Sequence, residues 1–90
     1  MRVEISVPQY SRDKDLVVEW EPEPVIRATH QPDGMHVQAN RDGCVTLARI
    51  FLSLAQDGVP NGVHLHLESS NGLTDDSSPW TIELQSTDAR

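Results

Sequence analysis

The sequence is poor in cysteine, in aromatic residues and in basic residues, and it has no long apolar run. Its single cysteine, Cys44, cannot form a disulfide within the chain, which is typical of a reducing compartment. No stretch approaches the roughly 18 consecutive apolar residues that span a bilayer. The first ten residues also lack the apolar core of a signal peptide. These absences predict a cytoplasmic protein that does not enter a membrane.

The shortage of basic residues narrows the choice of partner. Seven Lys and Arg residues stand against 14 Asp and Glu residues, and the formal net charge is −7 at pH 7. Nucleic-acid phosphates are bound by clustered Lys and Arg, whereas these seven are scattered. The charge therefore argues against nucleic acid and anionic lipid, and it favours a protein with a basic surface. The same acidity is also typical of a small domain that only needs to stay soluble.

Ninety residues are enough for one domain with a thin core. Six stretches have the composition of strands, and most of them alternate apolar with polar residues. They are residues 2–7, 16–20, 25–29, 35–40, 63–68 and 80–85. We expect an α+β fold, in which a mainly antiparallel sheet of five to six strands carries one amphipathic helix on one face. Within it we expect N-terminal strands (1–34), a strand–helix–strand–strand core (35–86) and a tail (87–90).

The helix, expected over residues 41–57, has the clearest pattern. Asn40 suits the N-cap, Gly58 suits the left-handed residue after the helix, and Pro60 blocks continuation. Apolar residues at helical spacing predict a buried stripe. Its members are Cys44, Leu47, Ala48, Phe51, Leu54 and Ala55. The opposite strip, expected in water, consists of Thr46, Arg49, Ser53 and Gln56.

One helix covers one face of a sheet, so the other face is expected to stay in water. The polar members of the strands would form it: His36, Gln38, Asn40, His64, His66, Glu68, Thr81, Glu83 and Gln85. From this set we select the candidate partner-binding residues, which are His36, Gln38, His64, His66, Glu68 and Glu83. An ordinary half-solvated sheet would present the same kind of surface.

The segment His64-Leu65-His66-Leu67-Glu68 is the best candidate for chemistry. Residues two apart share a strand face, so His64, His66 and Glu68 would project together. Two imidazoles and a carboxylate are suitable ligands for zinc or ferrous iron. Ligands from one strand are nearly parallel, however, and a neighbouring strand would have to complete the site. No nucleophile motif or glycine-rich phosphate loop accompanies the segment, so we expect no catalysis and no cofactor.

A longer pattern extends from about residue 40 to residue 85. It begins with Asn40-Arg41-Asp42-Gly43, continues through TLARIFLSLAQ and VPNGVHLHLE, and closes with WTIEL. This pattern resembles the bacterial polymorphic-toxin immunity protein 32 family, most specifically between Leu54 and Glu68. Two positions depart from it. Cys44 stands where a larger aliphatic residue is expected, and Glu68 stands where aspartate is expected.

The resemblance implies an α+β immunity protein that binds and blocks a cognate toxin inside the producing cell, without chemistry of its own. The negative charge would suit a toxin with a basic surface. Two other readings stay open. One is a small metal-binding protein or metal-dependent enzyme that uses His64, His66 and Glu68. The other is a self-associating structural domain, in which exposed edge strands pair. Across these readings the chain is expected to be a monomer or a homodimer joined through an edge strand.

Overall fold

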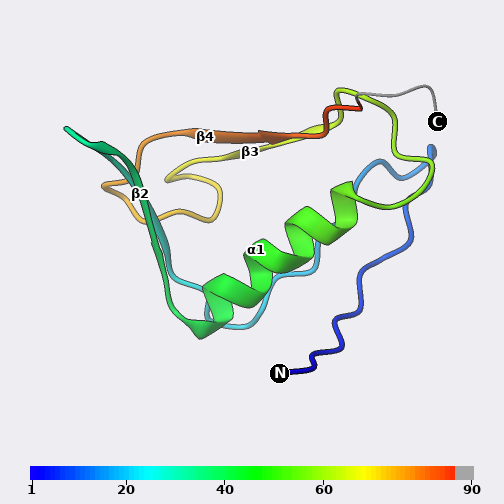
Figure 1. Cartoon of the computed structure of the whole chain (residues 1–90), viewed down its shortest axis with the longest axis horizontal. Helices are drawn as coiled ribbons and strands as arrows, with labels where there is room; N and C mark the ends of the chain where they lie inside the picture. The colour runs from blue at the N-terminus through cyan, green and yellow to red at the C-terminus, as the bar shows by residue number, and fades with distance from the viewer. Residues whose placement is uncertain (87–90) are drawn as a thin grey trace.

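The computed structural model describes residues 1–86, which hold one helix and four strands (Figure 1). In chain order these are β1 (Ile26–Gln31), β2 (Gly34–Ala39), α1 (Arg41–Leu54), β3 (His64–Leu67) and β4 (Trp80–Glu83). β1 pairs with β2 and β3 pairs with β4, both antiparallel, in two separate sheets. The α+β class and the antiparallel pairing are confirmed, but the single sheet of five to six strands is wrong. The expected tail at 87–90 lies outside the described residues.

The strands expected at 2–7 and 16–20 do not form. Residues 1–25 instead run beside α1 without a paired strand, apart from a turn closed by one bridge between Ser11 and Asp15. Alternation shows which side chains are apolar, but it does not show which backbone will pair. Here the unpaired backbone hydrogen-bonds to polar side chains of the helix instead. The amide of Glu21, for example, donates to Thr46 Oγ1 over 3.1 Å.

α1 is rotated about its axis relative to the predicted orientation. Thr46 and Ser53, which were expected in water, are fully buried, whereas Cys44 is exposed and Phe51 is 51% exposed. The N-terminal segment covers the polar strip of the helix and hydrogen-bonds to Thr46, Arg49 and Gln56. Within residues 1–86 the buried hydroxyl of Ser53 has no hydrogen-bond partner. Part of the apolar stripe is left uncovered. α1 also ends at Leu54, three residues before the predicted end at 57.

The helix start is as predicted. The Oδ1 atom of Asn40 accepts hydrogen bonds from the amides of Gly43 (2.7 Å) and Val25 (2.9 Å). Its Nδ2 atom donates to the carbonyl of Glu23 over 2.9 Å. Asn40 therefore caps the helix and also fixes the chain that enters β1.

The core lies where α1 meets both hairpins. Its buried apolar residues come from β1, α1, β3, β4 and the loop before β4: Ile26, Ala28, Ile50, Leu54, Leu67, Leu73 and Ile82. That loop is fastened to β1, since the amide of Thr74 donates to the carbonyl of Ile26 (3.0 Å) and the amide of Ser78 donates to that of Ala28 (2.7 Å). Within residues 1–86, which the structure describes, the helix α1 is too short and too polar to cross a membrane.

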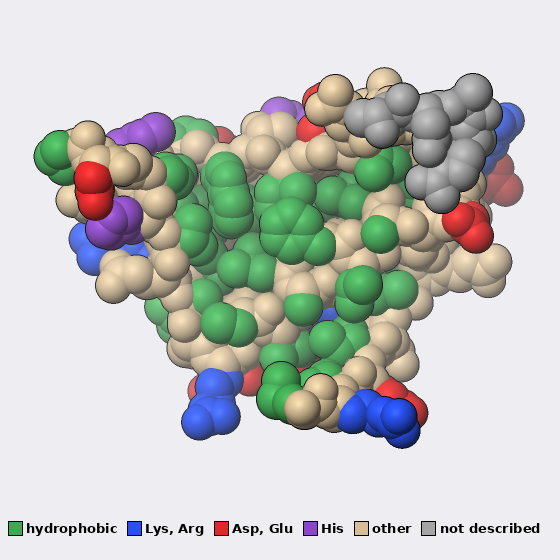
Figure 2. All heavy atoms as spheres, in the orientation of Figure 1, with side chains coloured by type: hydrophobic (Ala, Val, Ile, Leu, Met, Phe, Trp, Pro, Cys, Tyr) green, Lys and Arg blue, Asp and Glu red, His purple; other side chains and the backbone are tan. Residues whose placement is uncertain are grey.

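Hydrophobic side chains remain at the surface on one side of the molecule. Apolar side chains gather over the middle of the face toward the viewer, between the hairpin β1–β2, the helix α1 and the hairpin β3–β4 (Figure 2). On the elements themselves, the exposed large apolar residues are Met35 and Val37 on β2 and Phe51 and Leu52 on α1. The helix was expected to cover the apolar row of β2, and it leaves Met35 and Val37 37% and 40% exposed.

Candidate functional site

The outward face of β3–β4 carries both histidines of the histidine-rich strand. The alternation predicted for β3 is confirmed, because His64 and His66 are exposed while Leu67 is buried. The antiparallel register places His64 opposite Glu83 and His66 opposite Thr81. The two imidazole rings meet edge to face, with their centroids 4.8 Å apart. Two exposed rings and one carboxylate therefore form a polar patch on this hairpin.

Hydrogen bonds orient both imidazoles. His64 Nδ1 lies 2.9 Å from the carbonyl oxygen of Gly62 and 3.9 Å from a carboxylate oxygen of Glu83. Both oxygens are acceptors, so we assign the ring proton to Nδ1, which leaves Nε2 as an acceptor. His66 Nδ1 lies 3.1 Å from Thr81 Oγ1. The patch therefore offers imidazole nitrogens and a carboxylate oxygen to hydrogen-bond donors and cations of a partner.

Glu68 follows β3 and has a different environment. Its carboxylate accepts a hydrogen bond from the hydroxyl of Ser70 over 3.1 Å, and its carbonyl accepts from the amides of Asn71 and Leu73. In the part of the chain that the structure describes, no group of three or more His, Cys, Asp or Glu side chains is placed to hold a metal ion. The metal-binding alternative on His64, His66 and Glu68 therefore gains no support from the geometry.

The remaining two candidates, His36 and Gln38, lie on β2 and hence in the other sheet. His36 Nε2 lies 3.4 Å from a carboxylate oxygen of Asp33. Gln38 Oε1 accepts a hydrogen bond from Arg27 Nη1 over 3.3 Å. All six selected residues are exposed, as expected, but they are divided between two sheets rather than gathered on one face. Their role in partner binding stays a prediction.

Arg27 links β1 to the loop before β4. Its Nε donates to Asp76 over 2.7 Å, and the hydroxyl of Thr74 donates to the same carboxylate, also over 2.7 Å. The hydrogen bond from Thr74, together with the guanidinium of Arg27, holds the pKa of Asp76 below its ordinary value of 3.8. This contact fastens a polar loop beside Gln38 without burying a charge.

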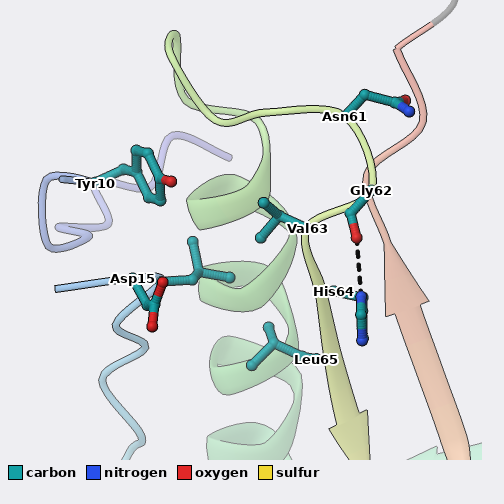
Figure 3. Close-up of a pocket in the computed structure, with 8 residues that line it drawn as sticks. Tyr10, Asp15, Asn61, Gly62, Val63, His64 and Leu65 are labelled. Carbon is teal, nitrogen blue, oxygen red and sulfur yellow. Dashed lines mark hydrogen bonds between the residues drawn. The ribbon is translucent and has the colours of Figure 1, made fainter. Parts of the chain in front are cut away.

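A groove of about 510 Å³ lies between the N-terminal segment and β3. Tyr10 and Leu16 line one side, and Val63 and Leu65 line the other. Tyr10, Val63 and Leu65 point into this space, whereas the ring of His64, another residue of the lining, points toward β4 (Figure 3). The groove was not predicted, because the composition of residues 16–20 indicated a strand there. The polar strip of the helix was the available signal, since its side chains could hold an unpaired segment.

The sequence comparison decides the family. The family model described as immunity protein 32 matches residues 34–85, which is more than half of the 90 residues. The chain belongs to the immunity protein 32 family. The resemblance noted over about residues 40–85 is thereby confirmed, and the immunity protein 32 match begins six residues earlier, at the start of β2. It covers β2, α1, β3 and β4, and it leaves out β1 and the N-terminal segment. No curated protein and no solved structure matches the chain significantly.

Proposed function

We propose that this chain neutralises a cognate bacterial toxin by binding it directly, inside the cell that produces both proteins. Membership of the immunity protein 32 family carries the proposal. An immunity protein of this kind needs only to occlude its toxin, so no chemistry of its own is required. The toxin is the expected partner, and the complex is the functional state.

The charge distribution supports a basic partner. The matched residues 34–85 contain six Asp and Glu residues and two Arg residues, so their formal net charge is 2 − 6 = −4. One of the two arginines, Arg49, already pairs with Glu21. An acidic surface is attracted to the basic cleft of an enzyme that acts on nucleic acid, and this attraction speeds the encounter. A toxin with such a cleft is the partner that the charge favours.

We assign the docking surface to the outward face of β3–β4 and the residues that follow it. Glu83 is exposed there beside His64, and Glu68 follows His66 by two residues. Carboxylates next to imidazoles give one surface both acceptors for Lys and Arg and flat rings for packing. His36 and Gln38 on β2 form a second, separate contact surface in this proposal.

We expect the gene immediately upstream to encode a secreted protein with a toxin domain, and the test measures the binding of that domain to this chain. Charge reversal by Glu83→Lys or Glu68→Lys is expected to weaken binding roughly tenfold or more, because a like charge would face the basic surface. Glu19→Lys is the matched control, since Glu19 is an exposed carboxylate outside the matched residues and should change affinity little. The association rate should also fall as salt is raised.

Two results would count against different parts of the proposal. A toxin domain that does not bind the native chain at all would remove the immunity function. Tight binding that Glu19→Lys weakens as strongly as Glu83→Lys would keep the function and remove the assigned surface.

A further inference from the structure

The two edges of the β1–β2 hairpin are in different states. On β1, the carbonyls of Ile26 and Ala28 accept hydrogen bonds from the loop before β4, and the amide of Ala28 donates to Ser77 Oγ over 3.0 Å. These backbone groups therefore point away from β2. Ile26 and Ala28 face Ala39 and Val37 in the register. Residues that face each other in an antiparallel pair point their backbone groups the same way, inward or outward. The backbone groups of Met35, Val37 and Ala39 consequently point outward, along the free edge of β2.

That free edge lacks the usual protection against pairing. Natural edge strands are guarded by lysine, proline, an inward-pointing charge or a bulge. β2 reads GMHVQA, with no Asp, Glu, Lys, Arg or proline, and its pairing with β1 is continuous from Gly34 to Ala39. In the part of the chain that the structure describes, the outward groups have one weak contact, from the Cys44 thiol to the Ala39 carbonyl over 3.8 Å. Met35 and Val37 also leave apolar surface exposed on this strand.

We propose that β2 pairs with β2 of a second copy of this chain, antiparallel about a two-fold axis at Val37. This register aligns the outward amides and carbonyls of both strands. It places Val37 opposite Val37 of the second copy and Met35 opposite Ala39, so one face of the joined strands is apolar. On the other face His36 stands opposite Gln38. No pair brings two like charges together, and the result is a continuous four-stranded sheet.

The absence of charge along this edge favours a second copy of the chain over a toxin as the partner of β2. A basic segment of a toxin would meet no carboxylate along β2. In contrast, β2 of a second copy offers an apolar row and a polar row that match those of the first. The net charge of −7 on each copy opposes association, but charges further apart than about 8 Å are largely screened at physiological salt. The hairpin lies at one end of the molecule and its tip projects beyond it, so two copies can meet there with their bodies apart (Figure 1).

The first experiment measures the mass of the native chain in solution over a wide concentration range. We expect a reversible change from the mass of one chain to that of two. Val37→Lys would set two lysines opposite each other at the axis, and it should weaken dimerisation roughly tenfold or more. Val17→Lys is the control, because Val17 is similarly exposed (44%, against 40% for Val37) but lies outside the strand. It should dimerise like the native chain.

A cross-link tests the register independently. In a Cys44→Ser background, Val37→Cys should form a disulfide between two copies on oxidation, since the facing Cα atoms of a hydrogen-bonded antiparallel pair lie about 5.5 Å apart. Phe51→Cys in the same background, on the exposed part of the helix, should not cross-link at the same rate. Circular dichroism of each variant confirms that it is folded.

Either of two results overturns the inference. One is a native chain that stays a monomer at every concentration, even if Val37→Lys weakens toxin binding, since the edge would then belong to the toxin. The other is a dimer that Val37→Lys leaves intact while Phe51→Cys cross-links efficiently, because the interface would then be the helix. Neither result bears on whether the chain neutralises a toxin.

Discussion

Arg49 on α1 donates a hydrogen bond from Nη1 to the carboxylate of Glu21, 28 residues earlier in the chain, over 2.5 Å. The two side chains are only 17% and 27% exposed. The Nε atom of Arg49 also donates to the carbonyl of Ser6 over 3.3 Å. One arginine of the helix thus holds two separate parts of the N-terminal segment, and it does so from the strip that its sequence position assigns to solvent.

Arg49→Met should lower the free energy of unfolding by about 1–2 kcal/mol, because a partly shielded charge-assisted hydrogen bond is lost while the aliphatic stem is kept. Urea unfolding measures this loss. Arg41→Met, at an exposed arginine of the same helix, is the control and should stay within about 0.5 kcal/mol. Equal losses in the two variants would show that the Arg49–Glu21 contact contributes nothing specific.

Gly43→Ala should destabilise the protein even though alanine favours a helix by about 1 kcal/mol. A Cβ atom at Gly43 would lie 2.6 Å from the carbonyl oxygen of Val25 and 3.1 Å from Cβ of Ala39. Backbone cannot yield cheaply here, and overpacking costs about 1–3 kcal/mol. Cys44→Ala, at the exposed next position, should be nearly neutral. A higher melting temperature for Gly43→Ala would refute the close approach of α1 to β1.

Ile50→Ala and Phe51→Ala compare neighbouring positions on the helix. Ile50 is fully buried and Phe51 is 51% exposed. We expect Ile50→Ala to lose about 2–5 kcal/mol of stability. Phe51→Ala should lose about 1 kcal/mol or less, since much of its surface is already in water. Denaturant unfolding of both variants tests the orientation of α1. The orientation expected from the apolar stripe would make Phe51→Ala the more destabilising of the two.

The contact of Asp76 makes a small part of the stability depend on acid. The pKa of this carboxyl is lower in the folded chain than its ordinary value of 3.8. Its contribution is therefore complete above that value and is lost as pH falls through the folded pKa. NMR titration should find the low pKa, and Thr74→Val should move it back toward 3.8 because the hydroxyl donor is gone. Asp75→Asn is the control and should leave the pKa of Asp76 low. A Thr74→Val titration identical to the native one would show that the hydroxyl has no part in the shift.

Features set by neighbouring residues could be predicted from the sequence. Asn40 caps α1 as expected, since capping needs only the amide of a residue three positions later. The alternation of β3 placed His64 and His66 in water, because side chains two apart share a strand face. For the candidate site, the sequence therefore predicted which side chains are exposed. It did not show that Glu83 faces His64, which depends on the register with a strand 16 residues further along.

Features set by distant parts of the chain could not be predicted. The apolar stripe placed Phe51 inside and Thr46 outside, and the structure reverses both. An amphipathic pattern gives the preferred face of an isolated helix, whereas packing depends on what the rest of the chain brings to each side. Residues 1–25 have backbone amides that pair with no strand, and two of these amides donate hydrogen bonds to Thr46 and Gln56 on the polar strip of the helix.

The amino-acid sequence alone was enough to predict the class of the fold, the start of the helix, the alternation of the histidine-rich strand and the family. These depend on contacts within a few residues, or on a pattern that is read directly from the letters. Three features became visible only in the folded chain. Residues 1–86 form two small sheets, α1 turns its polar strip toward the N-terminal segment, and one edge of β2 stays open within these residues. Each of those outcomes depends on where unsatisfied backbone groups far apart in the chain find their hydrogen-bond partners, which no local pattern records.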